Sequence, residues 1–339
     1  MRIVLDAMGS DNHPEPEIRA AINASHLYPD EIILVGPHDL LESKLRATQP
    51  DHRIRIAHAS QVLEMTDKPA ENARRKTDTS MAVGMELIRR GEADVFITAG
   101  NTGGAMATAL FILRRIRGVR RPALTAQFPV RNGHCIVLDI GANADCKPEH
   151  LVQFALMGSV YAEKVLQKSD PRVALLSNGE EAGKGNQLTK ETYPILKELL
   201  PNFIGNVEPK ELFNGEADVV VTDGFTGNIL LKSSEAVAKF LTDIIRAEML
   251  KSLQTKIGAL LAKPAFASVK KIMDPGEVGA APLLGVNGLV FIGHGRSDDV
   301  ALLNAIRVAR QAVEAGLLRE IQTAIMQRLS TYPQPFPDD

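Results

Sequence analysis

The chain contains one strand-turn-helix phrase twice. The copies are residues 91–103, GEADVFITAGNTG, and 215–227, GEADVVVTDGFTG, which are identical at nine of thirteen positions. Each reads as a short buried strand, a turn and an apolar helical run. Such a corner offers free backbone N–H groups and the positive end of a helix dipole at the carboxyl end of the strand, which suits an anion. Two copies therefore predict a cleft built for phosphate.

Short runs rich in Val and Ile alternate with helical stretches along the chain. Runs that are apolar on both faces and separated by helices predict a mostly parallel sheet that is covered on both sides. The expected strands are 3–5, 32–35, 95–97, 135–138, 173–176, 219–221 and 289–292. We predict a three-layer αβα unit over 1–330, with two lobes around a cleft and its chemistry at the carboxyl ends of strands.

Length and composition limit the class of protein. The 339 residues can bury a large core, and 45% hydrophobic residues, 24% charged residues and a net charge of −2 are ordinary for a globular protein. Bulk charge thus gives no case for nucleic acid. The amino terminus does not resemble a secretory signal, and the longest apolar run, 105–113, is too short to span a membrane. We expect a cytoplasmic protein.

Cysteines, histidines and nucleotide fingerprints give little support to other chemistries. Cys135 lies inside an apolar run and Cys146 near a helix start, so we expect no disulfide, no structural metal and no cysteine nucleophile. The eight histidines lack the paired spacing of a helical metal site. The Gly-x-Gly-x-x-Gly fingerprint is missing, although dehydrogenases that bind nicotinamide differently stay open.

A long helical stretch interrupts the alternation of strands and helices. Apolar residues recur at helical spacing over 232–262, Pro264 is expected to end this helix, and a shorter helix over 266–273 is expected to return. A helix of that length extends about 45 Å, so part of the hairpin 232–273 should project from the body. The proline-rich segment 331–339 is predicted to be a flexible tail.

The predicted hairpin carries lysines around apolar residues. Leu260, Leu261 and Phe266 beside Lys263 fit shallow insertion into an anionic membrane surface. A dimer interface fits equally well. We expect dimerisation along the base of the hairpin and membrane contact at its tip.

Five arginines follow the first copy of the phrase within eight residues. They are Arg114, Arg115, Arg117, Arg120 and Arg121. Cations at the end of a helix complement its dipole, which is the simpler interpretation. The alternative is a docking patch for an acidic partner, since the rest of the chain is slightly acidic.

Two glycine-rich loops could contact an oxyanion. The turn 98–104 has three glycines and hydroxyl or amide side chains at a helix start, although a capped helix explains it too. The loop 177–186 departs from a Walker loop, because three residues instead of four separate its glycines and Gly185 replaces the magnesium ligand. Its Lys184 is a flexible cation that could meet phosphate, or simply a solvated lysine.

Seven segments carry a close resemblance to a known family. They are 6–11 (DAMGSD), 98–104 (TAGNTGG), 139–143 (DIGAN), 145–150 (DCKPEH), 177–181 (SNGEE), 184–185 (KG) and 222–228 (TDGFTGN). Together they resemble the PlsX family, the bacterial phosphate acyltransferases of phospholipid synthesis, over nearly the whole chain. The resemblance implies a fold like that of phosphotransacetylases and of the isocitrate and isopropylmalate dehydrogenases.

The same resemblance implies an activity and partners. A long-chain fatty acyl group would move from acyl carrier protein to inorganic phosphate, giving acyl phosphate for a downstream membrane glycerol-3-phosphate acyltransferase. It also implies a homodimer that associates loosely with the cytoplasmic membrane and uses no metal or organic cofactor. Phosphate would attack the thioester directly, and because a thiol leaves easily at its pKa of roughly 8.5, no acyl-enzyme and no catalytic triad are expected.

Site residues are assigned on this basis. Phosphate is expected at Asn101, Thr102, Gly103 and Gly104 with Ser177, Asn178, Thr226 and Gly227. Lys184 and Asn228 are expected to position phosphate and stabilise the oxyanion, and Asp223 to orient one of them. The arginine cluster would then dock acyl carrier protein, which is acidic.

Three other functions stay open. A coenzyme A-dependent phosphate acetyl- or butyryltransferase would have little need for a lysine-ringed hairpin. A nicotinamide-dependent dehydrogenase of the related fold would be revealed by absorbance of the reduced nicotinamide. A catalytically silent scaffold that recruits lipid-synthesis partners would show no phosphate-dependent turnover.

Overall fold

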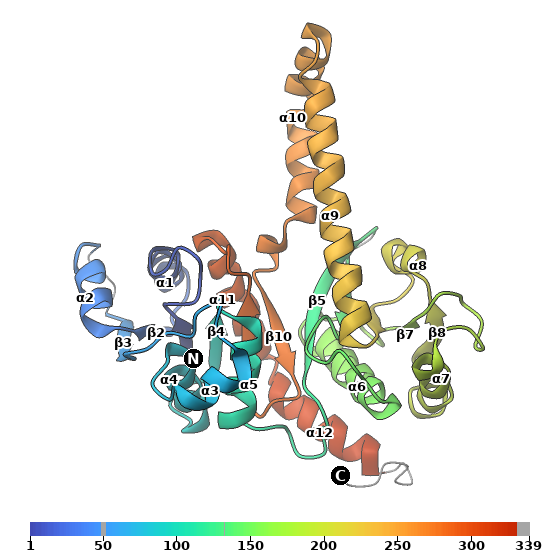
Figure 1. The fold of residues 1–339 in the computed structure, drawn as a ribbon, viewed down its shortest axis with the longest axis horizontal. Coiled ribbons are helices and arrows are strands. Elements are labelled where there is room, and N and C mark those ends of the chain that lie inside the picture. The colour runs from blue at the N-terminus through green and yellow to red at the C-terminus, as the bar shows by residue number, and fades with distance from the viewer. Residues whose placement is uncertain (49–51, 132, 331–339) are drawn as a thin grey trace.

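The computed structural model describes residues 1–48, 52–131 and 133–330, and over these ranges the chain forms one sheet of eleven strands flanked by helices (Figure 1). The predicted α/β class with a large, mostly parallel sheet is confirmed. The strand order is β3-β2-β1-β4-β11-β10-β5-β6-β9-β7-β8. The strands are β1 (Arg2–Asp6), β2 (Glu31–Gly36), β3 (Ile54–His58), β4 (Val95–Thr98), β5 (Ala123–Val130), β6 (Gly133–Leu138), β7 (Val173–Leu176), β8 (Phe203–Val207), β9 (Val219–Val221), β10 (Ala280–Leu284) and β11 (Val290–Gly293).

The sheet consists of two parallel halves that run in opposite directions. The first half is β3, β2, β1, β4 and β11, and the second is β6, β9, β7 and β8. Between them, β10 is antiparallel to β11 and to β5, and β5 is antiparallel to β6. β4 and β9 therefore point in opposite directions, and their carboxyl ends lie at the two opposite edges that the strand ends form. The direction reverses between the halves because the two central strands β10 and β5 pair antiparallel with their neighbours.

The two central strands separate over most of their length. β5 and β10 pair only through Leu124 with Leu283 and Ala123 with Leu284. Beyond these pairs β5 continues to pair with β6, and β10 with β11. Figure 1 shows β5 and β10 diverging toward the projecting helices. The sheet thus opens between its two halves.

Helices cover both faces of the sheet, as a three-layer unit requires. Side chains of α1, α2, α6, α7, α11 and α12 join the hydrophobic core on one face, and side chains of α4, α5, α8 and the start of α9 join the core on the other. The helices are α1 (Glu15–Leu27), α2 (His38–Arg46), α3 (Pro69–Arg75), α4 (Ser80–Arg89), α5 (Thr102–Ile112), α6 (Pro148–Lys164), α7 (Gln187–Leu199), α8 (Pro209–Asn214), α9 (Gly224–Met249), α10 (Leu253–Met273), the 3-10 turn η1 (Pro275–Glu277), α11 (Asp299–Glu314) and α12 (Leu317–Ser330).

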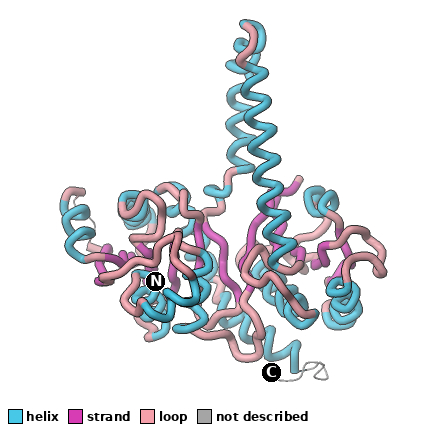
Figure 2. Tube along the Cα trace, viewed as in Figure 1, coloured by secondary structure: helices cyan, strands magenta, loops and turns pink. Residues whose placement is uncertain are grey.

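A helical hairpin projects from the body, but its bounds differ from those predicted. α9 starts at Gly224 and ends at Met249, and α10 runs from Leu253 to Met273 with Pro264 inside it. Figure 2 shows two helices joined by a short loop at the far end. A proline lacks one backbone N–H, which usually ends an isolated helix, but α10 packs along α9 and continues through it.

The corrected bounds move the tip of the hairpin. Residues 250–252 form the turn, so Leu260 and Leu261 lie about two turns down α10 and Phe266 lies nearer the base. The predicted tip residues are therefore on the side of the second helix. The predicted tail, 331–339, lies outside the described residues.

Candidate functional site

The first copy of the phrase forms a capped helix start. Asn101 is the N-cap of α5, where its side-chain oxygen accepts a hydrogen bond from the backbone N–H of Gly104 at 2.9 Å. Its side-chain nitrogen donates to the carbonyl oxygens of Glu64 and Met65 at 3.2 and 3.1 Å. The side chain of Asn101 is thus used in holding the turn, while the N–H groups of Thr102 and Gly103 begin the helix.

A buried carboxylate holds the strand that leads into this turn. Asp6 accepts hydrogen bonds from the hydroxyl of Thr98 at 2.7 Å and from the N–H of Met8 at 3.1 Å. The same Thr98 hydroxyl accepts from the N–H of Gly100 at 2.9 Å. A Cβ at Gly9 would lie 2.9 Å from the backbone nitrogen of Gly100, so only glycine fits there. The loop after β1 therefore supports the α5 turn from beneath.

A second buried carboxylate lies beside the first. Glu17 on α1 is fully buried and accepts the backbone N–H of Ser10 at 2.9 Å through one oxygen. Its other oxygen has no partner among the described residues. Burial raises the pKa of Glu17 to about 7, against hydrogen bonds from Ser10 that lower it.

The second copy also forms a capped helix start. Asp223 is the N-cap of α9, and its carboxylate accepts from both the backbone N–H and the hydroxyl of Thr226 at 2.8 Å. Asp223 and Thr226 therefore satisfy each other. Asn228, one turn into the helix, is exposed, and its Cβ lies 3.8 Å from where a Cβ on Gly141 would be.

The loop 139–143 packs against this helix start. A Cβ at Gly227 would lie 1.9 Å from the carbonyl oxygen of Asp139, and Gly224 donates its N–H to the carbonyl of Asn143 at 2.8 Å. The carboxylate of Asp139 is fully buried and gathers the N–H groups of the loop. Burial raises the pKa of Asp139, although these hydrogen bonds oppose the rise. Close glycine contact explains why the second copy ends in glycine.

The glycine-rich loop after β7 lies at the same edge of the sheet as Asp223. β7 and β9 are parallel neighbours, so Ser177 and Asp223 follow adjacent strand ends. Asn178 accepts the N–H of Gly185 at 2.9 Å, which folds the loop back, and Lys184 is exposed. The hydroxyl of Ser177 is buried without a partner among the described residues. The loop thus presents an exposed lysine beside the second helix start.

A large cleft joins parts of both copies. Its volume is about 1500 Å³, and Thr102, Gly103 and Asn228 line it together. Of the other predicted catalytic and phosphate-binding residues, none lines it; they are Asn101, Gly104, Ser177, Asn178, Lys184, Asp223, Thr226 and Gly227. Asn228 reaches the cleft one turn into α9, beside Gly141, which also lines it.

Three basic side chains in the cleft were not predicted as a group. His294 follows β11, Arg296 lies two residues later, and Lys232 is one turn beyond Asn228 on α9. Burial and then the charges of Arg296 and Lys232 lower the pKa of His294, whereas the charges of Glu235 and Asp11 oppose this shift. Helical spacing of four between Asn228 and Lys232 was the available sequence signal.

The arginine cluster follows the carboxyl end of α5, at the other end of that helix from Thr102. Arg115 donates to the carbonyl oxygen of Arg120, which folds the segment into a compact loop. The carbonyl oxygen of Pro122, which follows the cluster, accepts from the side chain of Asn143 at 2.7 Å, and Leu124 lines the cleft. The cluster is therefore joined to the cleft by two residues of chain.

Neither cysteine is poised as a nucleophile. Burial raises the pKa of Cys135 and of Cys146 to about 12, so both are thiols at neutral pH. Within the described ranges, no three His, Cys, Asp or Glu side chains gather as a metal site. A search of the described helices finds none that is both long and apolar enough to cross a membrane.

Comparisons with known proteins place these observations in a family. The family model described as "Fatty acid synthesis protein" matches residues 1–320. A phosphate acyltransferase of Acidobacterium capsulatum is 48% identical over 322 residues, covering 94% of this chain and 96% of the relative. A phosphate acyltransferase of Elusimicrobium minutum is 46% identical, covering 99% of this chain and 98% of the relative.

Solved structures share the fold at low sequence identity. A phosphotransacetylase of Streptococcus pyogenes is 18% identical with a TM-score of 0.58, covering 92% of this chain and 94% of that one. A 4-hydroxythreonine-4-phosphate dehydrogenase of Klebsiella pneumoniae is 13% identical with a TM-score of 0.56, covering 92% and 98%. Identities this low show the fold alone, and the two activities differ on one architecture.

Proposed function

The chain belongs to the fatty acid synthesis protein family, and from that membership we propose that it transfers a long-chain fatty acyl group from acyl carrier protein to inorganic phosphate. The observation that carries the proposal is that the start of α5, Asn228 on α9 and three basic side chains open into one cleft. An anion site and an apolar space beside it are what a phosphate nucleophile and an acyl donor need.

The phosphate is held at the start of α5. N–H groups of Thr102 and Gly103 and the positive end of the helix dipole suit an oxyanion. Arg296 and Lys232 supply positive charge from the two sides of the cleft. The side chain of Asn101 and the N–H of Gly104 support this turn, since they are bonded to each other.

The thioester carbonyl lies near Asn228. Its side-chain amide can donate to the oxyanion that forms when phosphate attacks. Lys184, with Ser177 and Asn178, assists from the loop at the neighbouring strand end, and Asp223 and Thr226 fix the helix start that carries Asn228. Both cysteines are protonated thiols, which favours direct attack by phosphate over a cysteine acyl-enzyme.

The test of function is incubation with long-chain acyl carrier protein and phosphate. We expect phosphate-dependent thiol release and an acyl phosphate that hydroxylamine traps as the hydroxamate. Thiol release at a rate independent of the phosphate concentration would refute the proposal. The same assay with acetyl or butyryl coenzyme A tests the short-chain transferase, and absorbance of reduced nicotinamide tests the dehydrogenase. No turnover with any donor would favour the scaffold.

Two substitutions test the assigned roles. Lys184→Ala and Asn228→Ala should each lower phosphate-dependent turnover by at least tenfold, about 1.4 kcal/mol. Asn228 is the proposed donor inside the cleft, and Lys184 is the proposed cation on the loop beside the helix start that carries Asn228. Lys190→Ala, on exposed α7 beyond the loop, is the matched control and should match wild type. Turnover of both variants within about threefold of wild type would show that the assignment is wrong.

The proposed partners are acyl carrier protein, a second copy of the chain and an anionic membrane surface. The exposed arginine cluster suits an acidic carrier, and no metal or organic cofactor takes part in the proposed reaction. The exposed apolar side chains of the hairpin suit a dimer along its base and a membrane near its tip. Membrane contact would bring the product to a membrane glycerol-3-phosphate acyltransferase.

A further inference from the structure

One wall of the cleft is an apolar face of β5. Leu124, Ala126, Phe128 and Val130 alternate along the strand and line the cleft, so their side chains share one face of the sheet. Leu124 and Phe128 belong to the same hydrophobic cluster as Ile140, which also lines the cleft. This face offers a continuous hydrocarbon surface along the strand.

The facing wall is the first part of α9. Asn228, Leu231, Ala238 and Leu241 line the cleft, and their spacing of three and seven residues puts them on one side of the helix. Ser234 and Glu235 lie on the same side and also line the cleft. Leu241 is 51% exposed although it lies over the cleft. Ala236 is exposed and does not line the cleft, because it lies on another side of α9. A groove with apolar side chains on both walls thus runs between β5 and α9.

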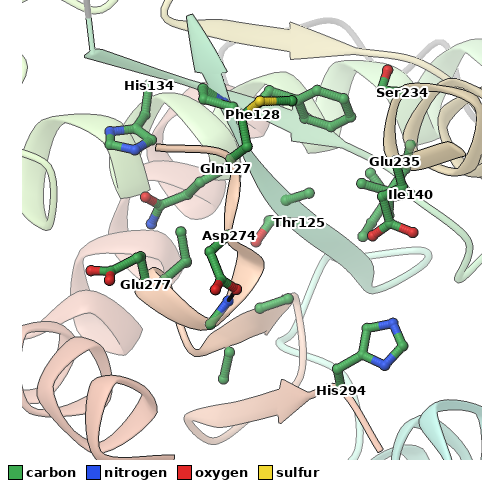
Figure 3. A pocket seen from close by; sticks show the side chains of 18 of the residues that line it. Thr125, Gln127, Phe128, His134, Ile140, Ser234, Glu235, Asp274, Glu277 and His294 are labelled. Carbon is green, nitrogen blue, oxygen red and sulfur yellow. Dashed lines mark hydrogen bonds between the residues drawn. The ribbon is translucent and has the colours of Figure 1, made fainter. Parts of the chain in front are cut away.

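Polar groups line the cleft as well, among them Gln127 on β5 and Ser234 and Glu235 on α9. Gln127, on the other face of β5, donates to the hydroxyl of Tyr161 at 3.3 Å. Figure 3 shows Gln127, Asp274 and Glu277 on one side of the view, and Ile140 with Glu235 and Ser234 on the other. The part of this lining that suits a hydrocarbon chain is the apolar face of β5 with Leu231, Ala238 and Leu241 of α9.

The two ends of the groove differ in chemistry. One end has Asn228 beside Gly141, and the other reaches Ile272 and Met273, which line the cleft at the base of the hairpin. Ile272 and Met273 are exposed by 61% and 44%. The groove thus starts at a donor that can meet a carbonyl and ends at exposed apolar residues, which Lys271 and Asp274 flank in the cleft lining.

We propose that this groove holds the acyl chain of the thioester donor, with the carbonyl carbon at Asn228 and the methyl end toward Ile272 and Met273. The inference rests on the proposed acyl transfer and adds the path of the chain. The cleft of about 1500 Å³ exceeds the roughly 300–1,000 Å³ of common small-molecule sites, which leaves room for phosphate and a long chain together.

A bulky side chain in the groove tests the path. Ala238→Trp narrows the groove, and Ala236→Trp adds the same ring on another side of α9. Burying one methylene is worth about fourfold in binding, so excluding two or more lowers the ratio of kcat/KM for long-chain over short-chain donors at least tenfold in A238W. A236W should keep the wild-type ratio. An unchanged ratio in A238W would overturn the path.

A second measurement locates the chain directly. The chain contains no tryptophan, so an introduced one is the sole indole. Position 241 lines the groove, so Leu241→Trp places its indole there. Position 240 does not line the cleft, so Phe240→Trp is the control. A long-chain fatty acid with a nitroxide near its methyl end should quench the fluorescence of L241W and not that of F240W. Equal quenching, or none in L241W, would contradict the proposal.

The outcomes separate this inference from the function itself. If wild type releases no thiol from any acyl donor, the acyl transfer fails, whatever the fluorescence shows. If wild type turns over donors of every length while A238W keeps its ratio and L241W is not quenched, only the path fails. Quenching of L241W that a second copy of the chain prevents at high protein concentration would assign the groove to the dimer instead.

Discussion

The carboxylate of Asp139 is the residue on which the second helix start most depends. One of its oxygens accepts the backbone N–H groups of Leu124, Gly141 and Ala142 at 3.0–3.2 Å. The other accepts the backbone and side-chain N–H groups of Asn143 at 2.7 and 2.8 Å. Each oxygen therefore serves at least two donors, and the loop beneath Asn228 is tied to one side chain.

Asp139→Asn should be destabilising for this reason. Whichever oxygen becomes an NH₂ group will face N–H donors instead of accepting from them. We expect a loss of roughly 2–4 kcal/mol in the free energy of unfolding and a parallel loss of acyl transfer. Denaturant unfolding followed by circular dichroism measures the first effect. A loss below about 0.5 kcal/mol would show that the loop does not depend on the carboxylate.

Glu17 should make stability depend on pH. Its pKa is about 7 in the fold, against an ordinary value of 4.5 for a solvated glutamate, so folding favours its protonated form. The stabilisation is fully present below pH 4.5 and is lost as the pH rises through 7, a change of roughly 3 kcal/mol between pH 4 and 8. Glu17→Gln should remove this part of the pH dependence. Parallel stability curves for the variant and wild type would contradict the shift.

The sequence predicts the buried parallel strands of Val, Ile and Leu but misses four other strands. All seven runs of Val, Ile and Leu are strands, but β3, β5, β8 and β10 were not predicted. β5 and β10 carry Pro129 and Pro282, and β5 has Thr125 and Gln127 among its apolar residues. Such mixed segments become strands only in the assembled sheet, where neighbouring strands supply their packing and hydrogen bonds. The reversal of direction and the opening of the cleft follow from the two missed strands β5 and β10.

The hairpin shows the same limit for helices. Periodicity over 232–262 cannot mark a turn at 250–252, because apolar residues continue on both sides of it. Ser252 caps α10 and accepts the N–H of Thr255 at 3.1 Å, a local signal that outweighs Pro264 as a boundary. Leu253, Leu260 and Leu261 are 71–77% exposed on the outer part of α10.

Two charge substitutions should separate the roles of the hairpin. Leu253→Glu lies beside the turn, so it should abolish the proposed sedimentation with anionic vesicles and leave the proposed dimer intact. Val269→Glu lies near the base of the same helix, is 53% exposed, and should weaken the dimer with less effect on sedimentation. Analytical ultracentrifugation and vesicle pelleting measure the two effects. Identical behaviour of the two variants would show that one surface serves both purposes.

The two halves of the sheet run in opposite directions, which explains why the repeated phrase predicts only part of the site. Both copies form the predicted strand-turn-helix corner, yet β4 and β9 end at opposite edges. Asn228 and Lys232, in the first turns of α9, nevertheless line the same cleft as Thr102. Sequence identity between the copies gives the corners, but direction in the sheet is set by strands outside both copies.

Docking of an acidic carrier at the arginine cluster can be tested by reversing the charge of the cluster. Arg117 and Arg121 are exposed, and the chain runs from the cluster through Pro122 to Leu124 in the cleft. An acidic carrier bound to the cluster would lie where the polypeptide runs from the arginines into the cleft. Coenzyme A has no acidic protein surface that could bind the arginines. R117E/R121E should therefore slow turnover of acyl carrier protein donors at least fivefold more than turnover of acyl coenzyme A.

If charge guides the carrier to the cluster, salt dependence and a control variant should give two further results. Salt screens charges over about 10 Å at 0.1 M, so the difference between donors should shrink as ionic strength rises. K44E/R46E on α2, at the far edge of the sheet (Figure 1), carries the same change in net charge and should slow both donors equally. If K44E/R46E discriminated between donors as strongly as R117E/R121E, the overall charge of the protein and not the cluster would guide the carrier.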